Sequence, residues 1–315
     1  MKLTADCTDC LISRVEYESR LCIDDSLRVS EIVDACRNLL ERIAADPVPA
    51  PVIASRVHRL AYRMIGDPDP PYRSLKKGNN ADAAAVCRAV RGELATFRDL
   101  ALASVIGNTL DYGSQAHTVT DNFVEFFRRE FAAGGLTVDD TAAIERLASR
   151  VVYLADNCGE IVFDALFADY LKRNGAHVAF AVRGAPPILN DATMEDAVAL
   201  GLDRRVDLLT PTTDGIAELG LNREHAPPPA LADALDRATL VIAKGMANYE
   251  SLSDGRDLPP VAYLMSVKCG PIGADIGIPV APGSPSSGSE RRHPHRIRAS
   301  PDSRLYKHPR KFFPG

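Results

Sequence analysis

An aspartate and an asparagine, Asp156 and Asn157, follow Val151–Ala155, a run of apolar and β-branched residues that is typical of a buried strand. Gly159 then allows a tight turn, and the spacing of apolar residues after it predicts a helix over Ile161–Asn174. In an open α/β sheet, such a turn lies at the carboxyl ends of the strands, where ligands bind. The two side chains therefore offer adjacent oxygen ligands at the mouth of a crevice.

The start of that helix, near Glu160, adds free backbone N–H groups, which favour an anion such as phosphate. The same place can thus accept an oxygen-ligated cation and a phosphate-sized anion. A purely structural interpretation explains the motif equally well, because Asp156 or Asn157 can cap the helix. The motif alone leaves both interpretations open.

Two further strand ends carry polar residues suited to the same site. The predicted strand His177–Arg183 leads through a Gly–Pro turn to Asp191, which can supply a third oxygen ligand or cap the next helix. The predicted strand Thr239–Ala243 is followed by Lys244 and Gly245, where a cation and a closely approaching backbone can meet a phosphate. The structural alternative for the lysine is a solvated surface side chain.

A third motif, Gly107-Asn108, closes an apolar helix pattern and leads to Asp111. Both residues of the pair tolerate positive φ, so spacing alone favours a helix C-cap.

The cysteines Cys7 and Cys10 form a CxxC pattern, which is a weak signal when it stands alone. The pair can bind a metal, cycle between thiols and disulfide, or pack as small apolar residues on one helical face. Cys269 is a candidate to join them in space.

The elements that must position these residues change character along the chain. Helix patterns occupy the first part, and three amphipathic helices precede residue 75. From about residue 150, strands alternate with helices, which predicts a mostly parallel sheet covered on both faces. The strand candidates are Val151–Ala155, His177–Arg183, Arg205–Leu209, Thr239–Ala243 and Val261–Val267. We expect an α-helical domain over residues 1–95 and an α/β/α domain over residues 96–280.

Composition sets broad limits. The 315 residues are 46% hydrophobic and 25% charged, which suits a soluble globular protein with a core that needs no disulfide. With a net charge of −5, the molecule as a whole lacks the excess of positive charge that is typical of nucleic-acid-binding proteins. No apolar run has the length of a membrane span and no signal peptide is recognisable, so we expect a cytoplasmic protein with reduced thiols.

The last part of the chain differs from the rest. Residues 281–315 are rich in Pro and Ser, have no apolar periodicity and carry a net charge of +6, against −11 in the remainder. This composition predicts a disordered basic tail.

Taken together, these motifs resemble the damage-control phosphatases, metal-dependent enzymes first catalogued as a domain of unknown function, and most closely their prokaryotic branch with an N-terminal CxxC. The matching pieces cover nearly all of the chain up to about residue 280. In order, they are Cys7-x-x-Cys10-Leu11, Gly107-Asn108-x-x-Asp111, Asp156-Asn157-x-Gly159-Glu160, the run from Arg183-Gly184-x-Pro186 to Asn190-Asp191, and Lys244-Gly245-x-x-Asn248-x-Glu250.

The resemblance implies a three-layer α/β/α Rossmann-like domain beside an α-helical N-terminal domain. It implies a divalent cation (Mg²⁺, Mn²⁺, Co²⁺ or Ni²⁺) on the catalytic residues Asp156, Asn157 and Asp191, and hydrolysis of phosphate monoesters of small metabolites such as sugar phosphates or damaged phosphometabolites. The residues expected around the substrate are Lys244, Gly245, Asn248, Asn108, Asp111 and Glu160. The oligomeric state is not indicated.

The end of the chain departs from the family pattern. Relatives continue past the segment that matches residues 269–280 into a short final strand, where this sequence has the basic tail. We therefore expect the sheet to lack that strand. A changed reading frame in the encoding DNA is one hypothesis for so abrupt a shift in composition.

Two carboxylates and an amide oxygen suit Mg²⁺ or Mn²⁺ better than a closed zinc site. Catalysis would then depend on electrostatic positioning of the phosphoryl group. The nucleophile is either a metal-oriented water or Asp156 through an aspartyl-phosphate, and the sequence leaves this open. The other function classes are a dinucleotide-binding oxidoreductase, for which no GxGxxG follows a strand, an S-adenosylmethionine-dependent carboxyl methyltransferase and a non-catalytic metabolite-binding protein.

Overall fold

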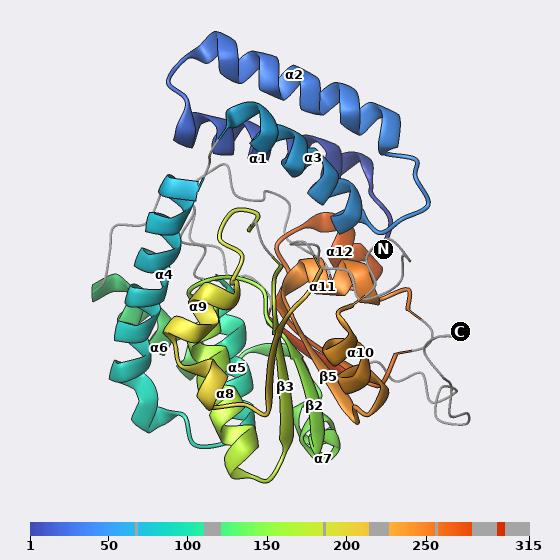
Figure 1. The fold of residues 1–315 in the computed structure, drawn as a ribbon. Coiled ribbons are helices and arrows are strands. Elements are labelled where there is room, and N and C mark those ends of the chain that lie inside the picture. Colours follow the sequence, from blue (N-terminus) through green and yellow to red (C-terminus); the bar gives the residue numbers. More distant parts are fainter. Residues whose placement is uncertain are drawn as a thin grey trace.

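The structure is a computed structural model that describes residues 1–66, 69–109, 121–184, 187–213, 227–255, 258–278 and 295–299. Three amphipathic helices at the N-terminus pack on one another at one end of the molecule (Figure 1): α1 (Ala5–Cys22), α2 (Ser26–Ile43) and α3 (Ala50–Ile65). Their apolar stripes enclose a core of their own, with Val15, Ile32 and Ile53 fully buried. The N-cap of α2 is Asp25, whose side chain accepts a hydrogen bond from the Leu27 amide at 2.9 Å.

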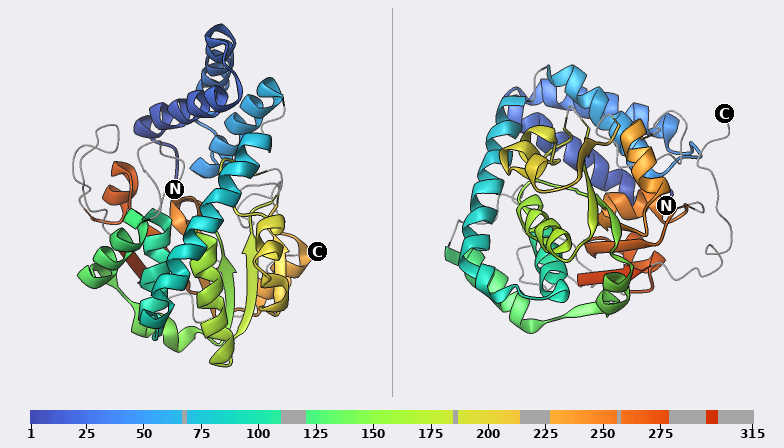
Figure 2. Two further views of the ribbon diagram at one scale, coloured as in Figure 1. Left: turned by 90° about the vertical axis from the view of Figure 1, so that its left-hand side faces the viewer. Right: turned by 60° about the horizontal axis from the view of Figure 1, so that its bottom comes forward.

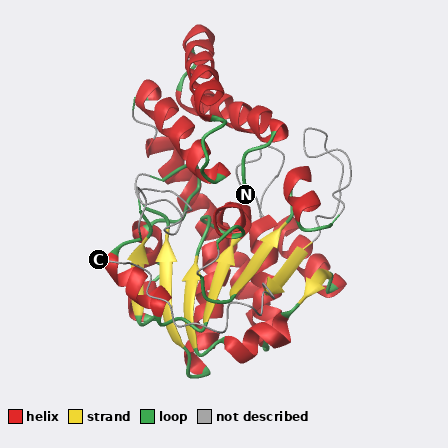
Figure 3. Ribbon diagram, turned by 90° about the vertical axis from the view of Figure 1, so that its right-hand side faces the viewer, coloured by secondary structure: helices red, strands yellow, loops and turns green. Residues whose placement is uncertain are grey.

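The described residues also form a seven-stranded sheet in the order β1-β7-β6-β5-β2-β3-β4 (Figure 3). Five neighbouring strands, from β6 to β4, run parallel. The bounds are β1 (Leu136–Asp139), β2 (Arg150–Leu154), β3 (His177–Val182), β4 (Leu208–Pro211), β5 (Leu240–Lys244), β6 (Val261–Ser266) and β7 (His295–Ala299). The mostly parallel α/β/α sheet predicted from the sequence is confirmed.

Helices cover both faces of this sheet, which is why its central strands are apolar on both sides. Side chains alternate along each strand. In β2, Val151 and Tyr153 join one core with the facing helices, whereas Val152 and Leu154 join the other. The remaining helices are α4 (Asp69–Val90), α5 (Phe97–Thr109), α6 (Asp121–Ala133), α7 (Thr141–Leu147), α8 (Glu160–Arg173), α9 (Met194–Ala199), α10 (Pro229–Asp236), α11 (Gly245–Leu252) and α12 (Gly270–Asp275), with 3₁₀ turns at Arg91–Glu93 and Leu202–Arg204.

Helix α4 connects the N-terminal helices to the sheet region. It runs from the three-helix end down the side of the molecule, beside α6 and α8 (Figure 2). Ala83, Val86 and Val90 on its second half belong to the core shared with α5 and α8. The domain boundary that we expected at residue 95 stays a prediction.

The strands at and near the edges differ from expectation. β4 begins three residues and ends two residues later than the predicted Arg205–Leu209, and the four-residue strand β1 was not predicted. β7 lies within the segment expected to be disordered, so that expectation is wrong for residues 295–299. β7 pairs antiparallel with β6 and parallel with β1, so the sheet does have a strand beside β6. None of the helices among the described residues is both long and apolar enough to cross a bilayer.

Candidate metal and phosphate site

The predicted site residues that the structure describes gather at the carboxyl ends of β2 and β5. These two strands are neighbours, yet the chain leaves β2 towards β3 on one side and returns to β5 on the other. This is the topological switch point of the sheet, where open α/β folds bind ligands. Asp156 follows β2, and Lys244 is the last residue of β5.

Asp156 and Asn157 do not cap the helix that follows them. The N-cap of α8 is Gly159, which has φ +88° and makes no side-chain cap. The Asp156 carboxylate, only 7% exposed, accepts a hydrogen bond at Oδ2 from Nδ2 of Asn157 at 3.1 Å. The Asn157 amide donates to Glu160 Oε1 at 2.9 Å. The capping interpretation of this motif is therefore wrong.

Asp191 is brought to the same place by pairing between two loops. A β-bridge joins Asn157 to Asp191, and the Ala192 amide donates to the Asp156 carbonyl at 3.0 Å. The helix cap proposed as an alternative role for Asp191 belongs instead to Thr193, whose amide donates to Asp196 at 2.9 Å. The Asp191 side chain is therefore not the cap, and its Oδ2 accepts the Ile188 amide at 2.9 Å.

Arg183 lies between the two aspartates. Its Nη2 contacts Asp156 Oδ1 at 2.6 Å and its Nε lies 3.8 Å from Asp191 Oδ1. Its Nη1 donates to Asn248 Oδ1 at 3.0 Å. Arg183 belongs to one of the sequence motifs but was not predicted as a site residue. The signal was its place directly after a buried strand, as with Asp156.

Lys244 is fully buried, so the alternative of a solvated surface lysine is wrong. Its ammonium donates to Glu160 Oε2 at 2.6 Å and to the Ser104 carbonyl at 3.0 Å, and it lies 3.3 Å from Asp164 Oδ1. Asp164, which was not predicted, also accepts hydrogen bonds from Ser104 Oγ at 2.6 Å and from the Tyr153 hydroxyl at 2.7 Å. The positive charge of Lys244 is therefore paired with two buried carboxylates, those of Glu160 and Asp164.

Gly245 and Asn248 begin α11 beside these groups. Gly245 has φ +73°. Asn248 is 1% exposed, and its Nδ2 donates to the Lys244 carbonyl at 2.8 Å while its Oδ1 accepts from Arg183. Asn248 thereby connects the end of β5 to the arginine between the aspartates.

The Gly107-Asn108 pair lies inside α5, which continues to Thr109, so the C-cap interpretation is wrong. A Cβ at Gly107 would lie 3.0 Å from the Phe163 ring and 3.3 Å from the Glu160 backbone, so glycine here lets α5 approach α8 closely. Asn108 Nδ2 donates to Glu160 Oε1 at 3.0 Å. Asp111 lies outside the described residues.

The buried groups have a charge imbalance. Two cations, Lys244 and Arg183, face four carboxylates, which are Asp156, Glu160, Asp164 and Asp191. Burial is the main cause that raises the pKa of Asp156, Asp164 and Asp191, the last to about 6, and Arg183 opposes it at both Asp156 and Asp191. If all six groups are ionised, the cluster carries two uncompensated negative charges.

These residues fit a divalent cation. Its charge would offset the two surplus negative charges, and the donors from Asp156, Asn157 and Asp191 are oxygens, which hard cations prefer. Within the described part of the chain there is no cluster of three or more His, Cys, Asp or Glu side chains placed to hold a metal. The predicted ligands Asp156, Asn157 and Asp191 do not form such a cluster, because Asn157 offers an amide oxygen in place of a carboxylate.

Helix α4 supplies two anchors that sequence reasoning missed. Asn80 Oδ1 accepts the Gly159 amide at 2.7 Å, which fixes the turn after Asp156. One helical turn earlier, Lys76 Nζ pairs with Asp196 Oδ2 at 2.7 Å and donates to Thr193 Oγ1 at 3.3 Å. One face of α4 therefore holds both the turn after Asp156 and the start of α9. No local pattern reveals contacts across so many residues.

None of the seven cysteines, all of which the structure describes, forms a disulfide. Cys7 and Cys10 both lie in α1, the first half-buried and the second exposed, so Cys10 does not act as a buried apolar residue. Burial is the main cause that raises the pKa of Cys269, and Cys7 and Cys10 add to this rise. A role for the CxxC stays a prediction.

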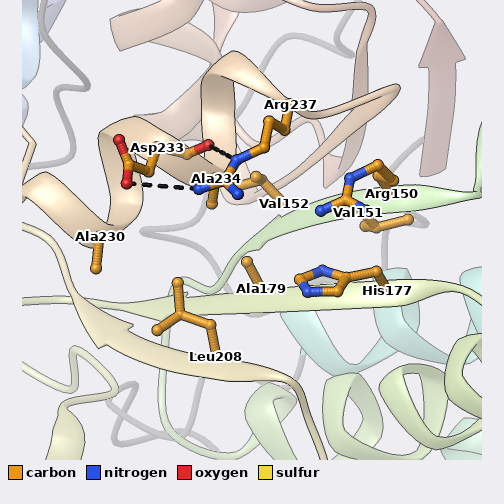
Figure 4. Close-up of a pocket in the computed structure, with 10 residues that line it drawn as sticks. All are labelled: Arg150, Val151, Val152, His177, Ala179, Leu208, Ala230, Asp233, Ala234 and Arg237. Carbon is orange, nitrogen blue, oxygen red and sulfur yellow. Dashed lines mark hydrogen bonds and ion pairs between the residues drawn. The ribbon is translucent and has the colours of Figure 1, made fainter.

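A separate cavity of about 250 Å³ lies at the other end of the sheet, under α10 (Figure 4). Arg150, His177 and Arg237 line it, together with the apolar side chains of Val152 and Leu208. Arg237 is paired with Asp233 at 3.4 Å. The cavity contains none of the predicted site residues, because it lies at the amino ends of β2 and β3.

Fold and site thus define a three-layer α/β protein with a buried, acidic, oxygen-rich cluster at the switch point of its sheet. Residues 3–282 match the model of the damage-control phosphatase ARMT1-like domain, and the chain belongs to this family. Proteins of this family are metal-dependent.

Named relatives support the assignment. A damage-control phosphatase of Archaeoglobus fulgidus is 39% identical over 89% of this chain and 97% of its own length. A damage-control phosphatase of Pyrococcus horikoshii is 23% identical over 89% of this chain and 96% of its own. The crystal structure of a DUF89 family protein from Pyrococcus horikoshii superposes with a TM-score of 0.80 at 23% identity, covering 89% of this chain and 96% of that one.

Proposed function

We propose that this protein is a divalent-metal-dependent phosphatase that hydrolyses phosphate monoesters of small metabolites, such as sugar phosphates or damaged phosphometabolites. The observation that carries the proposal is the convergence of Asp156, Asn157 and Asp191 on a buried cluster with two surplus negative charges, next to Lys244. Relatives that are named damage-control phosphatases over nearly their full length support it. No observation favours a methyltransferase, an oxidoreductase or a non-catalytic binding protein.

Asp156, Asn157 and Asp191 would hold the cation, which supplies Lewis acidity and charge neutralisation at the phosphoryl group when bound. Mg²⁺, Mn²⁺, Co²⁺ and Ni²⁺ are the candidates. Arg183 fixes the orientation of Asp156 by its 2.6 Å contact and lies within reach of Asp191. The protein would thus present both carboxylates already oriented, and less reorganisation would be needed when a substrate binds.

Lys244 supplies fixed positive charge behind the site. Burial lowers its pKa, but Asp164 and Glu160 outweigh burial, so the pKa is raised and the ammonium stays protonated. Together with Gly245 and Asn248 at the start of α11, it would stabilise the charge on the phosphate. Asn108, Asp111 and Glu160 complete the proposed surroundings of the substrate.

Two candidates for the nucleophile follow from the same residues. A water oriented at the site attacks phosphorus, and the bond to the ester oxygen breaks to release the alcohol and phosphate. Alternatively, an Asp156 oxygen attacks phosphorus and displaces the alcohol, and water then hydrolyses the aspartyl-phosphate to phosphate and the free carboxylate. Acid quench during turnover separates them, because only the second route leaves phosphate bound to the protein. We further propose a cytoplasmic protein divided into a helical domain (1–95) and an α/β/α domain (96–280).

The test is phosphate release from a panel of sugar phosphates by the metal-stripped protein, with and without added Mg²⁺, Mn²⁺, Co²⁺ or Ni²⁺. We expect turnover only with added metal, and its loss in Asp156→Ala. Asp233→Ala is the matched control. Asp233 lines the cavity under α10, far from the site, so this variant should retain wild-type rates. Metal-independent release, or near-normal rates in Asp156→Ala, would reject the proposal.

A further inference from the structure

Leu189 adopts an unusual backbone conformation near the proposed metal site. Among the described residues, it is the only one other than glycine with a positive φ, at +54°. A bulky side chain in this region is strained, and such strain persists only where the surroundings hold it. Leu189 lies two residues before Asp191, on the loop that joins β3 to α9.

The surroundings that hold it come from the N-terminal helices. The Leu189 amide donates to the hydroxyl of Tyr62 at 2.9 Å. Tyr62 lies on α3 and is 7% exposed. The side chains of Ile188 and Leu189 pack against the core formed by α1, α2 and α3. The loop is therefore docked on a part of the molecule that lies more than 100 residues away in sequence.

Ile188, which is part of this docked segment, hydrogen-bonds directly to the Asp191 carboxylate. The Ile188 amide donates to Asp191 Oδ2 at 2.9 Å, and the Asp191 amide donates back to the Ile188 carbonyl at 3.1 Å. Asp191 in turn is joined to Asn157 by the β-bridge. A continuous chain of contacts thus runs from Tyr62 through Leu189 and Ile188 to Asp191.

We propose that Tyr62 is a positioning residue, which acts through the Leu189–Ile188 turn to hold Asp191 for the metal. On this view the N-terminal helices complete the metal site without touching the ion. The inference rests on the proposed function only in taking Asp191 as a metal ligand. It does not depend on which substrate is hydrolysed.

The test measures Mn²⁺ affinity by calorimetry in the full-length protein. Tyr62→Phe removes one hydroxyl and keeps the ring, and we expect the Kd for Mn²⁺ to rise about 5- to 10-fold, as the loss of one buried hydrogen bond implies. Ile53→Val is the control, because Ile53 is fully buried in the same helical core and its side chain has no atom that can hydrogen-bond. It should lower stability and leave the Kd unchanged.

A second variant tests the route. Glycine adopts positive φ without strain, so Leu189→Gly no longer needs the tyrosine to keep its backbone in place. Tyr62→Phe added to Leu189→Gly should change the Kd less than twofold.

The inference is overturned if Tyr62→Phe lowers stability like Ile53→Val but binds Mn²⁺ as wild type does, or if its effect on the Kd is equally large in the Leu189→Gly background. Failure of the proposed function gives a different result. Wild-type protein would then bind Mn²⁺ without releasing phosphate, and Tyr62→Phe would still weaken that binding. A wild-type protein that binds no Mn²⁺ would overturn both.

Discussion

The carboxylate of Asp156 lies against the backbone of Gly245, in the space that any larger residue there would fill. A Cβ added at Gly245 would come within 1.9 Å of Asp156 Oδ2 and 2.6 Å of its Cγ. Gly245 follows β5 and Asp156 follows β2, so the contact depends on the pairing of these two strands. The glycine of the Lys-Gly motif therefore makes room for the proposed ligand as well as allowing the turn.

Gly245→Ala should displace Asp156 and weaken Mn²⁺ binding by at least tenfold, with a stability loss of about 2–3 kcal/mol from strain and overpacking. Calorimetry and urea unfolding measure the two effects. Gly277→Ala is a matched control, because Gly277 has the same φ of +73° but nothing within 4 Å of an added Cβ. It should cost only the backbone strain, about 1–2 kcal/mol. Equal losses in both variants, with normal Mn²⁺ binding, would show that the Asp156 contact is unimportant.

Asp164→Asn should destabilise the protein by about 2 kcal/mol, since a neutral amide replaces the buried carboxylate that accepts hydrogen bonds from Ser104 Oγ and the Tyr153 hydroxyl. It should also move the basic limb of the pH–rate profile to lower pH, because Asp164 raises the pKa of Lys244. Asp169→Asn on the same helix is the control, as its ion pair with Arg205 is partly exposed. A pH–rate profile that is unchanged in Asp164→Asn would remove Asp164 from the charge network of Lys244.

The pKa of Asp191, raised mainly by burial to about 6, gives a pH dependence to the metal-free protein. The folded state keeps this proton up to about pH 6, whereas the unfolded chain releases it near pH 4. The protonated Asp191 carboxyl therefore makes its full contribution to the free energy of unfolding below about pH 4. This contribution is lost as pH rises through about 6. Asp191→Asn should abolish this loss, which is on the order of 3 kcal/mol, and so stabilise the metal-free protein at pH 7.5 relative to wild type.

Urea unfolding in EDTA at pH 5 and pH 7.5 checks the sign. Asp207→Asn is a control that should change the stability at pH 7.5 in the opposite direction. Burial raises the pKa of Asp207, but hydrogen bonds from Lys172 and the Val178 amide outweigh it, and the net pKa is lowered. Its removal should therefore destabilise the protein at pH 7.5. An Asp191→Asn protein with the same pH dependence as wild type would contradict the assignment.

The central strands were predictable because each is a run of apolar residues buried on both faces. β2, β3, β5 and β6 lie within one residue of the predicted bounds at each end. β1 has only four residues, which alternate between half-buried and exposed, and β7 lies in a basic segment, so neither carries the signal of a central strand. β1 and β7 can be recognised as strands only in the folded sheet, where β7 pairs with β6 and β1 pairs with β7.

The site was predictable to the extent that polar residues follow strand ends in sequence. This pattern led to Asp156, Asn157, Asp191 and Lys244. The roles of Tyr62, Lys76 and Asn80 were not predictable, since each lies on a helix far from the loop that it holds. Local patterns contain no information on such contacts, which depend on how α3 and α4 pack against the sheet region.

The most direct test of the account is a calorimetric titration of Mn²⁺ into metal-stripped wild-type protein, Asp156→Asn and Asp191→Asn. The account predicts one site per chain in wild type and affinity at least 100-fold weaker in each variant, because each removes one of two charged ligands. Asp233→Asn should bind as wild type does. Wild-type affinity in either site variant would contradict the claim that loops after β2 and β3 converge on one ion.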